Sequence, residues 1–298
     1  MMEIRFQKYN SLSFQAHYKS PFSKQFEKVL HTGEGQNELI ANFKKLFPEK
    51  KTAKNRIGLG AYGSVFRIDD YYVFKVYHNQ KPELNGFKKN ENNKFDDLKT
   101  YSGKVLARIG NVEIIKNVTR DKNKFVEMAK PIDNGIPRYL KTLKEFASLP
   151  QKAFDTLAKD FQKLNEIKNP NLFYRFDTNN PNNFIKVGDK IKIVDDIDWV
   201  PTEEPNDLFN LLRIFIHKEG ESDYKKEIFK KCILASEKAN LPMEAAHKYL
   251  KKFMDEICQF ANSKKTFNEI FERLTDLRKN IPDETSRLKE VKNFIEEL

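Results

Sequence analysis

Residues 57–76, which read IGLGAYGSVFRIDDYYVFKV, restrict the fold of this chain more than any other segment. Apolar and polar residues alternate over residues 64–68, the pair Asp69-Asp70 suits a turn, and residues 71–76 form a second β-type run. A dinucleotide-binding fold would need a helix directly after the glycines Gly58, Gly60 and Gly63. The pattern therefore predicts a glycine-rich hairpin that runs into a third strand.

Lys75 is the charged residue of that third strand. Strand alternation places Val73, Lys75 and Tyr77 on one face, and a lysine among apolar residues is costly to bury unless it is paired. We predict a helix over residues 81–104, in which Glu91 shares a face with apolar residues at helical spacing, namely Phe87, Phe95 and Leu98. Glu91 is therefore the predicted partner of Lys75, although a surface lysine and a surface glutamate would give the same pattern.

Two later segments are rich in oxygen-bearing side chains. Residues 176–185 read FDTNNPNNFI, where Asp177 could orient an attacking hydroxyl and Asn182 or Asn183 could bind Mg²⁺. Residues 191–199 read IKIVDDIDW, a β-type run that ends in carboxylates suited to a hard cation. Taken singly, both segments are ordinary turn chemistry, and it is their order after the glycine hairpin and Lys75 that indicates a site.

The rest of the chain divides into a β-rich and a helical part. A helix is predicted over residues 36–47, and strands over residues 110–115 and 124–128. From residue 140 onward helical spacing dominates, interrupted by a β patch over residues 183–194. One helix is expected to begin at a capping box over residues 148–151 and to bury a single apolar face, made of Phe154, Leu157, Phe161 and Leu164. This order predicts an α+β fold with a small β-rich part before a larger helical part.

Composition excludes several classes of protein. With 298 residues, 39% of them hydrophobic, the chain can bury a core. Its net charge of +11 comes from Lys and Glu mixed along the whole sequence, so nucleic-acid binding is not favoured. No apolar run is long enough to span a membrane and the N-terminus lacks a secretory signal. Two cysteines are too few for a disulfide framework, which favours a reducing, cytoplasmic compartment.

In this order the motifs resemble the protein-kinase-like superfamily over residues 56–199, about half of the chain. The resemblance implies a bilobal fold, with an N-terminal extension (1–52), a β-rich N-lobe (53–130) and a helical C-lobe (131–298). It also implies that ATP and Mg²⁺ are bound. The residues expected to contact ATP are Gly58, Gly60, Ala61, Gly63, Val65, Val73, Lys75, Glu127 and Ala129, the last two in the hinge beside the adenine. Lys75 pairs with Glu91 in this scheme, Asp177 is the catalytic aspartate, and Asn183, Asn182 and Asp195 are metal ligands.

The sequence also departs from the family pattern. Arg175-Phe176-Asp177 stands where His-Arg-Asp is usual, and Asp195-Asp196-Ile197 lacks the phenylalanine and glycine of the metal-binding triplet. Asp196 or Asp198 is therefore an alternative to Asp195, and Asn183 is slightly preferred to Asn182. No Ala-Pro-Glu follows. In this the chain resembles the trimmed, atypical protein kinases found among bacterial effectors.

We therefore expect an ATP-dependent protein kinase that phosphorylates serine or threonine hydroxyls, with tyrosine as an alternative, and that also phosphorylates itself. Its partner would be a protein substrate, such as a host protein if the chain is secreted into a host cell by a specialised bacterial system. A small-molecule phosphotransferase of the same fold and a nucleotide-binding scaffold without activity are the alternatives. The oligomeric state has no signal in the sequence.

Overall fold

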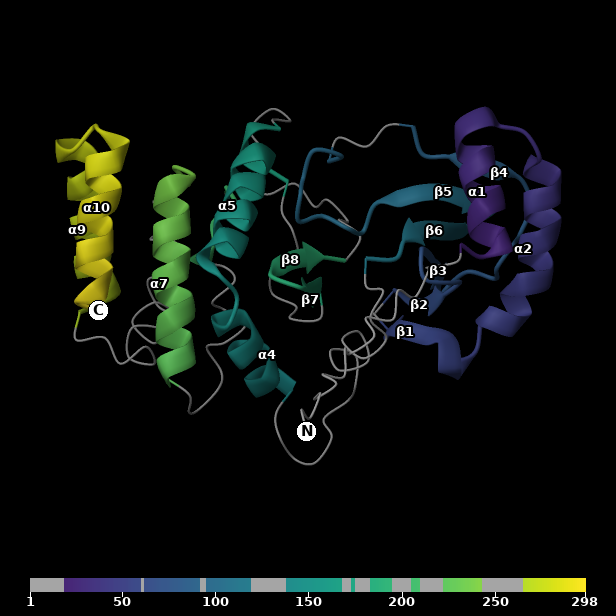
Figure 1. The fold of residues 1–298 in the computed structure, drawn as a ribbon, viewed down its shortest axis with the longest axis horizontal. Helices are drawn as coiled ribbons and strands as arrows, with labels where there is room; N and C mark the ends of the chain where they lie inside the picture. Colours follow the sequence, from purple (N-terminus) through teal and green to yellow (C-terminus); the bar gives the residue numbers. More distant parts are fainter. Residues whose placement is uncertain are drawn as a thin grey trace, which may run out of the picture.

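The computed structural model describes residues 19–59, 62–91, 95–118, 138–167, 173–174, 183–194, 205–209, 222–242 and 265–298. In these ranges the chain is an α+β protein, which confirms the predicted fold class. It has a six-stranded antiparallel sheet, a separate two-stranded hairpin and seven α-helices. Figure 1 shows the large sheet with two helices at one end of the molecule, the other helices at the opposite end and the small hairpin between them. None of the described helices is both long and apolar enough to cross a membrane.

Two N-terminal helices, α1 (Pro21–Thr32) and α2 (Gln36–Lys50), pack against the large sheet. The sequence sets the ends of α1. The side chain of Ser20 accepts a hydrogen bond from the backbone N–H of Ser23, and Gly33 ends the helix at a φ of 73°, which glycine adopts at little cost. The helix predicted over residues 36–47 is confirmed as α2, whereas α1 falls in a segment for which no helix is predicted.

The six strands of the large sheet follow the order β1-β2-β3-β6-β5-β4. Their bounds are β1 (Arg56–Leu59), β2 (Gly63–Arg67), β3 (Tyr72–Tyr77), β4 (Phe87–Lys89), β5 (Val105–Ile109) and β6 (Val112–Lys116), and a 3₁₀ turn, η1 (Ala53–Asn55), precedes them. The first three strands form an antiparallel meander. This confirms the predicted hairpin and the strand after it, and β6 confirms the strand predicted over residues 110–115.

The two faces of this sheet have different neighbours. Phe66, Phe74 and Ile114 are cross-strand partners on one face, and they join the apolar side chains of α1 and α2 in one hydrophobic cluster. Figure 1 places these two helices on the side of the sheet away from the remaining helices. Strand alternation puts Lys75 on the other face.

The helix predicted over residues 81–104 is wrong. Residues 81–86 form neither helix nor strand, β4 follows, and residues 95–97 form a turn. Phe87 packs against the sheet core, while Phe95 and Leu98 belong to the core of the helical part. Their helical spacing is therefore a coincidence, because the side chains separate into two cores. Gly86, at a φ of 68°, also interrupts the segment.

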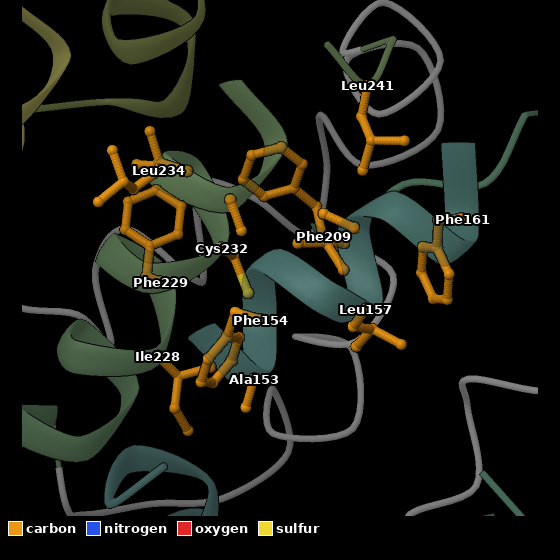
Figure 2. Packing of buried hydrophobic residues seen from close by; sticks show 14 of the residues in the cluster. Ala153, Phe154, Leu157, Phe161, Phe209, Ile228, Phe229, Cys232, Leu234 and Leu241 are labelled. Carbon is orange, nitrogen blue, oxygen red and sulfur yellow. The ribbon is translucent and has the colours of Figure 1, made fainter. Parts of the chain in front are cut away.

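The helical part is built from α4 (Arg138–Ala147), α5 (Gln151–Glu166), α7 (Ser222–Lys238), α9 (Phe267–Asn280) and α10 (Glu284–Glu296). They surround a second hydrophobic cluster, to which the small hairpin of β7 (Phe184–Val187) and β8 (Lys190–Ile193) also contributes. Figure 2 shows the centre of this core, where Phe154 and Leu157 of α5 lie near Cys232 of α7. The predicted apolar face of α5 is confirmed, since Phe154, Leu157, Phe161 and Leu164 are fully buried.

The predicted capping box at the start of α5 is wrong. Pro150 is the N-cap residue and makes no side-chain capping bond. The hydroxyl of Ser148 donates instead to the carbonyl oxygen of Glu145 in the preceding helix. Ser148 therefore closes the end of α4, and the fixed φ of proline starts α5.

Candidate functional site

Gly63, on β2 of the glycine hairpin, lies against the side chain of Lys75. A Cβ atom placed on Gly63 would lie 2.8 Å from the carbonyl oxygen of Val76 and 3.3 Å from Cε of Lys75. Only glycine fits at this position without a shift of the backbone, and its lack of a side chain lets the lysine stem pass beneath β2. Gly60 and Ala61, predicted to contact ATP, lie outside the described residues.

One cross-strand row runs across five of the six strands and contains three of the predicted ATP-binding residues, Gly58, Val65 and Lys75. Gly58 of β1 pairs with Val65 of β2, Val65 pairs with Lys75 of β3, and Lys75 pairs with Glu113 of β6. Glu113 in turn pairs with Arg108 of β5. Directly opposed residues of antiparallel strands share a face, so these five side-chain positions lie on the face that α1 and α2 do not cover.

Val73 extends this face toward the other end of β3. It is buried and pairs with Ile115 of β6, on the same face as Lys75. Val65 is half-buried. The structure thus brings together five of the residues predicted to contact ATP, which are Gly58, Gly63, Val65, Val73 and Lys75.

Lys75 is almost completely buried, with an exposed fraction of 9%. Its Nζ lies 5.0 Å from the centre of the Tyr77 ring, within the range of a cation–π contact. The hydroxyl of Tyr77 donates to Oε2 of Glu113 over 2.9 Å, and Glu113 is exposed by only 2%. The surroundings of Lys75 are therefore aromatic and acidic.

The prediction that Glu91 pairs with Lys75 lacks its structural basis. Glu91 follows β4 in an irregular, exposed segment, and no helix is formed there. The buried carboxylate opposite Lys75 is Glu113, which sequence reasoning missed. A signal was present, because Glu113 interrupts the apolar residues of a short strand as Lys75 interrupts those of β3.

The β7–β8 hairpin lies between the two segments that contain the predicted metal ligands Asn183 and Asp195. Phe184 pairs with Ile193, and the backbone N–H of Val194 donates to the carbonyl oxygen of Asn183 over 2.9 Å. Asn183, a predicted metal ligand, is buried, and Val194 directly precedes Asp195 in the sequence. Asp177, Asn182 and Asp195 lie outside the described residues, as do the hinge residues Glu127 and Ala129.

A pair of buried asparagines holds the chain just before the predicted catalytic segment. Oδ1 of Asn165 accepts a hydrogen bond of 2.7 Å from the backbone N–H of Asn206, and Nδ2 of Asn165 donates to the carbonyl oxygen of Asn206. The side-chain amide of Asn206 also donates to the carbonyl oxygen of Tyr174 over 2.5 Å. The end of α5 is therefore tied to Tyr174, three residues ahead of Asp177.

A second polar anchor ties the small hairpin to α5. Oδ2 of the buried Asp160 accepts hydrogen bonds from the backbone N–H and the hydroxyl of Thr100, over 2.5 and 2.6 Å. The carbonyl of Thr100 accepts from the N–H of Ile193, whose own carbonyl accepts from the N–H of Ser102. The segment that leads into β5 thus lies beside β8 and connects the two sheets.

The β7–β8 hairpin, which directly follows the predicted metal ligand Asn183, carries lysine side chains. Burial, together with nearby Lys190, lowers the pKa of Lys192 on β8. Within the part of the chain that the structure describes, no group of three or more His, Cys, Asp or Glu side chains could hold a metal ion. A metal site at the hairpin would need Asn183 together with residues outside the described ranges.

Comparison with protein-family models, with curated proteins and with solved structures gives no match for this chain.

Proposed function

We propose that this chain is an ATP- and Mg²⁺-dependent phosphotransferase of the protein-kinase-like superfamily, acting on hydroxyl groups of proteins. The observation that carries the proposal is the position of Lys75, which lies on β3, the third strand, with its side chain against Gly63 of the neighbouring glycine-bearing strand. Protein kinases place their ATP-binding lysine on the third strand, beneath a glycine-rich loop. The shared face of Gly58, Val65 and Lys75 supports the same reading.

In this proposal the face of the sheet that carries Lys75 binds the nucleotide. Val65 and Val73 contact the adenine, backbone N–H groups of the hairpin contact the phosphates, and the ammonium of Lys75 binds the phosphates as a point charge. Glu113 is the cross-strand partner of Lys75 and accepts hydrogen bonds from Arg108. The group therefore has an excess of cationic side chains, which suits a polyphosphate.

The acceptor and the metal would lie at the open end of the β7–β8 hairpin. Asp177 would orient the attacking hydroxyl, and Asn183 and Asp195 would hold Mg²⁺. Support comes from the Val194–Asn183 hydrogen bond, which joins the two segments that carry these residues. Two separate hydrophobic clusters, one in the sheet part and one in the helical part, support a bilobal arrangement.

The test is phosphate transfer from radiolabelled ATP in the presence of Mg²⁺. The wild type is compared with Lys75→Ala and Asp177→Ala. Lys45→Ala and Asp189→Ala serve as matched controls, since both residues are exposed and Lys45 lies on α2, which packs on the other face of the sheet from Lys75. We expect label in the wild type and in both controls, on the protein itself and on a serine-rich acceptor, and none in the two site variants. Wild-type labelling by Lys75→Ala or Asp177→Ala would refute the proposal.

The choice of acceptor separates the alternatives. Label on a serine-rich protein or on the chain itself supports a protein kinase, whereas label only on soluble alcohols supports a small-molecule phosphotransferase. Binding of ATP without transfer to any acceptor would identify a nucleotide-binding scaffold. Each alternative thus gives a different pattern in the same assay.

A further inference from the structure

We propose that Glu113 is the residue that positions Lys75 for ATP. Glu113 lies on a strand, and it would have the role that the resemblance to protein kinases assigns to Glu91 on a predicted helix. This inference rests on the proposed function and assigns a role within the same site. Glu113 would touch Lys75 and not the nucleotide, and so it is a positioning residue.

The first observation is the register of β3 and β6. Lys75 and Glu113 are direct cross-strand partners, and Cβ atoms of such partners lie about 4.5–5.5 Å apart. Both residues are buried, with exposed fractions of 9% and 2%. A buried ammonium and a buried carboxylate placed opposite each other compensate each other's loss of hydration.

The second observation is that both oxygens of Glu113 are fixed. Oε1 accepts hydrogen bonds from Nε and Nη2 of Arg108, at 3.1 and 2.8 Å. Oε2 accepts the hydroxyl of Tyr77 at 2.9 Å. A carboxylate held at both oxygens cannot turn away from the strand opposite, so it presents a fixed negative charge to Lys75.

The third observation concerns the lysine stem. Cε of Lys75 passes close under Gly63, and Nζ lies over the ring of Tyr77. Tyr77 thus contacts the ammonium with its ring and the carboxylate with its hydroxyl. A lysine side chain is flexible and has a high rotamer entropy. If Lys75 is already held in place before ATP binds, less conformational entropy is lost on binding.

Arg108 alone does not explain why Glu113 is buried. The Arg108 side chain is 53% exposed, whereas that of Glu113 is 3% exposed. An exposed arginine can pair with a surface carboxylate equally well, and such pairs contribute little. Lys75 is the buried cation of the group that requires a buried carboxylate nearby.

The experiment is a double-mutant cycle on ATP affinity. The dissociation constant of Mg²⁺–ATP is measured by calorimetry for the wild type, Glu113→Gln, Lys75→Met and the double variant, with Lys116→Ala as the control because Lys116 is exposed on the same strand. We expect Glu113→Gln to raise the dissociation constant by about tenfold or more, and to have no further effect in the Lys75→Met background. Glu113→Asp should recover part of the loss.

The outcomes separate the two proposals. If Lys75→Met binds ATP as the wild type does, the proposed function fails. If Lys75→Met loses affinity but Glu113→Gln does not, or if the effect of Glu113→Gln persists without Lys75, only the role of Glu113 is overturned. A structural role alone would lower the melting temperature without this dependence on Lys75.

Tyr77→Phe keeps the test valid if Glu113→Gln does not fold. It removes only the hydroxyl that binds Glu113 and leaves the ring under the ammonium. A rise in the ATP dissociation constant that disappears in the Lys75→Met background supports the inference. An unchanged dissociation constant in folded Tyr77→Phe overturns it.

Discussion

The backbone N–H of Val194 donates a 2.9 Å hydrogen bond to the carbonyl oxygen of Asn183, and this bond joins the two segments that carry the predicted metal ligands. The register of the hairpin produces it, because Phe184 pairs with Ile193 and the flanking residues therefore meet. Asp195 directly follows Val194. Two segments that are separate in the sequence thus meet at Asn183, one of the residues proposed to bind Mg²⁺.

Asn183→Ala is the first predicted variant. We expect it to lower the rate of Mg²⁺-dependent phosphate transfer by about a hundredfold, because a misplaced metal disturbs the alignment of the phosphates. The measurement is the initial rate as a function of Mg²⁺ concentration, with Asn182→Ala and Asp195→Asn assayed in parallel. A loss in Asn182→Ala and none in Asn183→Ala would assign the ligand to Asn182, and full activity in all three would contradict a metal site here.

Gly63→Ala tests the close approach of the glycine hairpin to β3. Its Cβ would lie 2.8 Å from the backbone carbonyl oxygen of Val76, so the strands must shift, at a cost of about 1–3 kcal/mol in stability. Because Lys75 lies beneath Gly63, ATP affinity should fall as well. Urea unfolding and calorimetry measure the two effects.

Gly58→Ala is the matched control for that variant. The nearest atom to its Cβ would be Cβ of Val65 at 3.4 Å, an ordinary contact, so a much smaller change in stability is expected. Equal destabilisation by Gly58→Ala and Gly63→Ala would show that loss of glycine flexibility, and not the contact with β3, decides the effect.

Glu237 joins the last three described helices through a buried ion cluster. Its side chain on α7 is fully buried, Nε of Arg278 on α9 lies 2.8 Å from Oε1, and Nε of Arg287 on α10 lies 3.7 Å from Oε2. Glu237→Ala would leave two partly buried cations without this partner, and we expect a loss of about 3–5 kcal/mol in the free energy of unfolding. Urea unfolding provides the measurement.

The control for Glu237 is Glu272→Ala, at an exposed position of α9. Its effect should stay within about 0.5 kcal/mol of the wild type. Equal losses for the two variants would mean that the ion cluster adds nothing beyond an average surface charge.

Local patterns in the sequence predict much of this fold. The glycine hairpin, the third strand with Lys75 and the apolar face around Phe154 depend on residues close together in the chain, where alternation and helical spacing are reliable. The helix at residues 36–47 was predictable for the same reason. The spacing of Phe87, Phe95 and Leu98 led to the wrong prediction of a helix over residues 81–104, because periodicity does not show which hydrophobic core a side chain will join.

The partner of Lys75 could not be predicted from local patterns. Glu113 reaches Lys75 through the pairing of β3 with β6, and strands distant in the sequence carry no local signal of their register. The link from Asn206 to Tyr174 has the same origin. Among the described residues of the candidate site, what the sequence could not supply was therefore the long-range strand pairing that places Glu113 opposite Lys75.

Lowering the pH should weaken the N-terminal caps of helices α9 and α10, in which Glu269 and Asp283 accept hydrogen bonds. Backbone and side-chain hydrogen bonds from Thr266 hold the pKa of Glu269 below its ordinary value of 4.5. Hydrogen bonds from the side chain and backbone of Ser286 hold the pKa of Asp283 below 3.8. Since both pKa values are lower in the folded state, the unfolded chain binds more protons in this range. The stabilisation is present above about pH 4.5 and is lost as the pH falls through the folded-state values.

The double variant Glu269→Gln, Asp283→Asn checks this pH dependence. Its free energy of unfolding, measured by urea at steps from pH 7 to pH 3, should fall less steeply below about pH 4.5 than that of the wild type, because two groups that take up protons on unfolding are gone. The amides keep an oxygen that can accept a capping hydrogen bond, so the helices should still form. Identical slopes for the two proteins would mean that other carboxylates control the acid sensitivity and that these caps contribute equally in both protonation states.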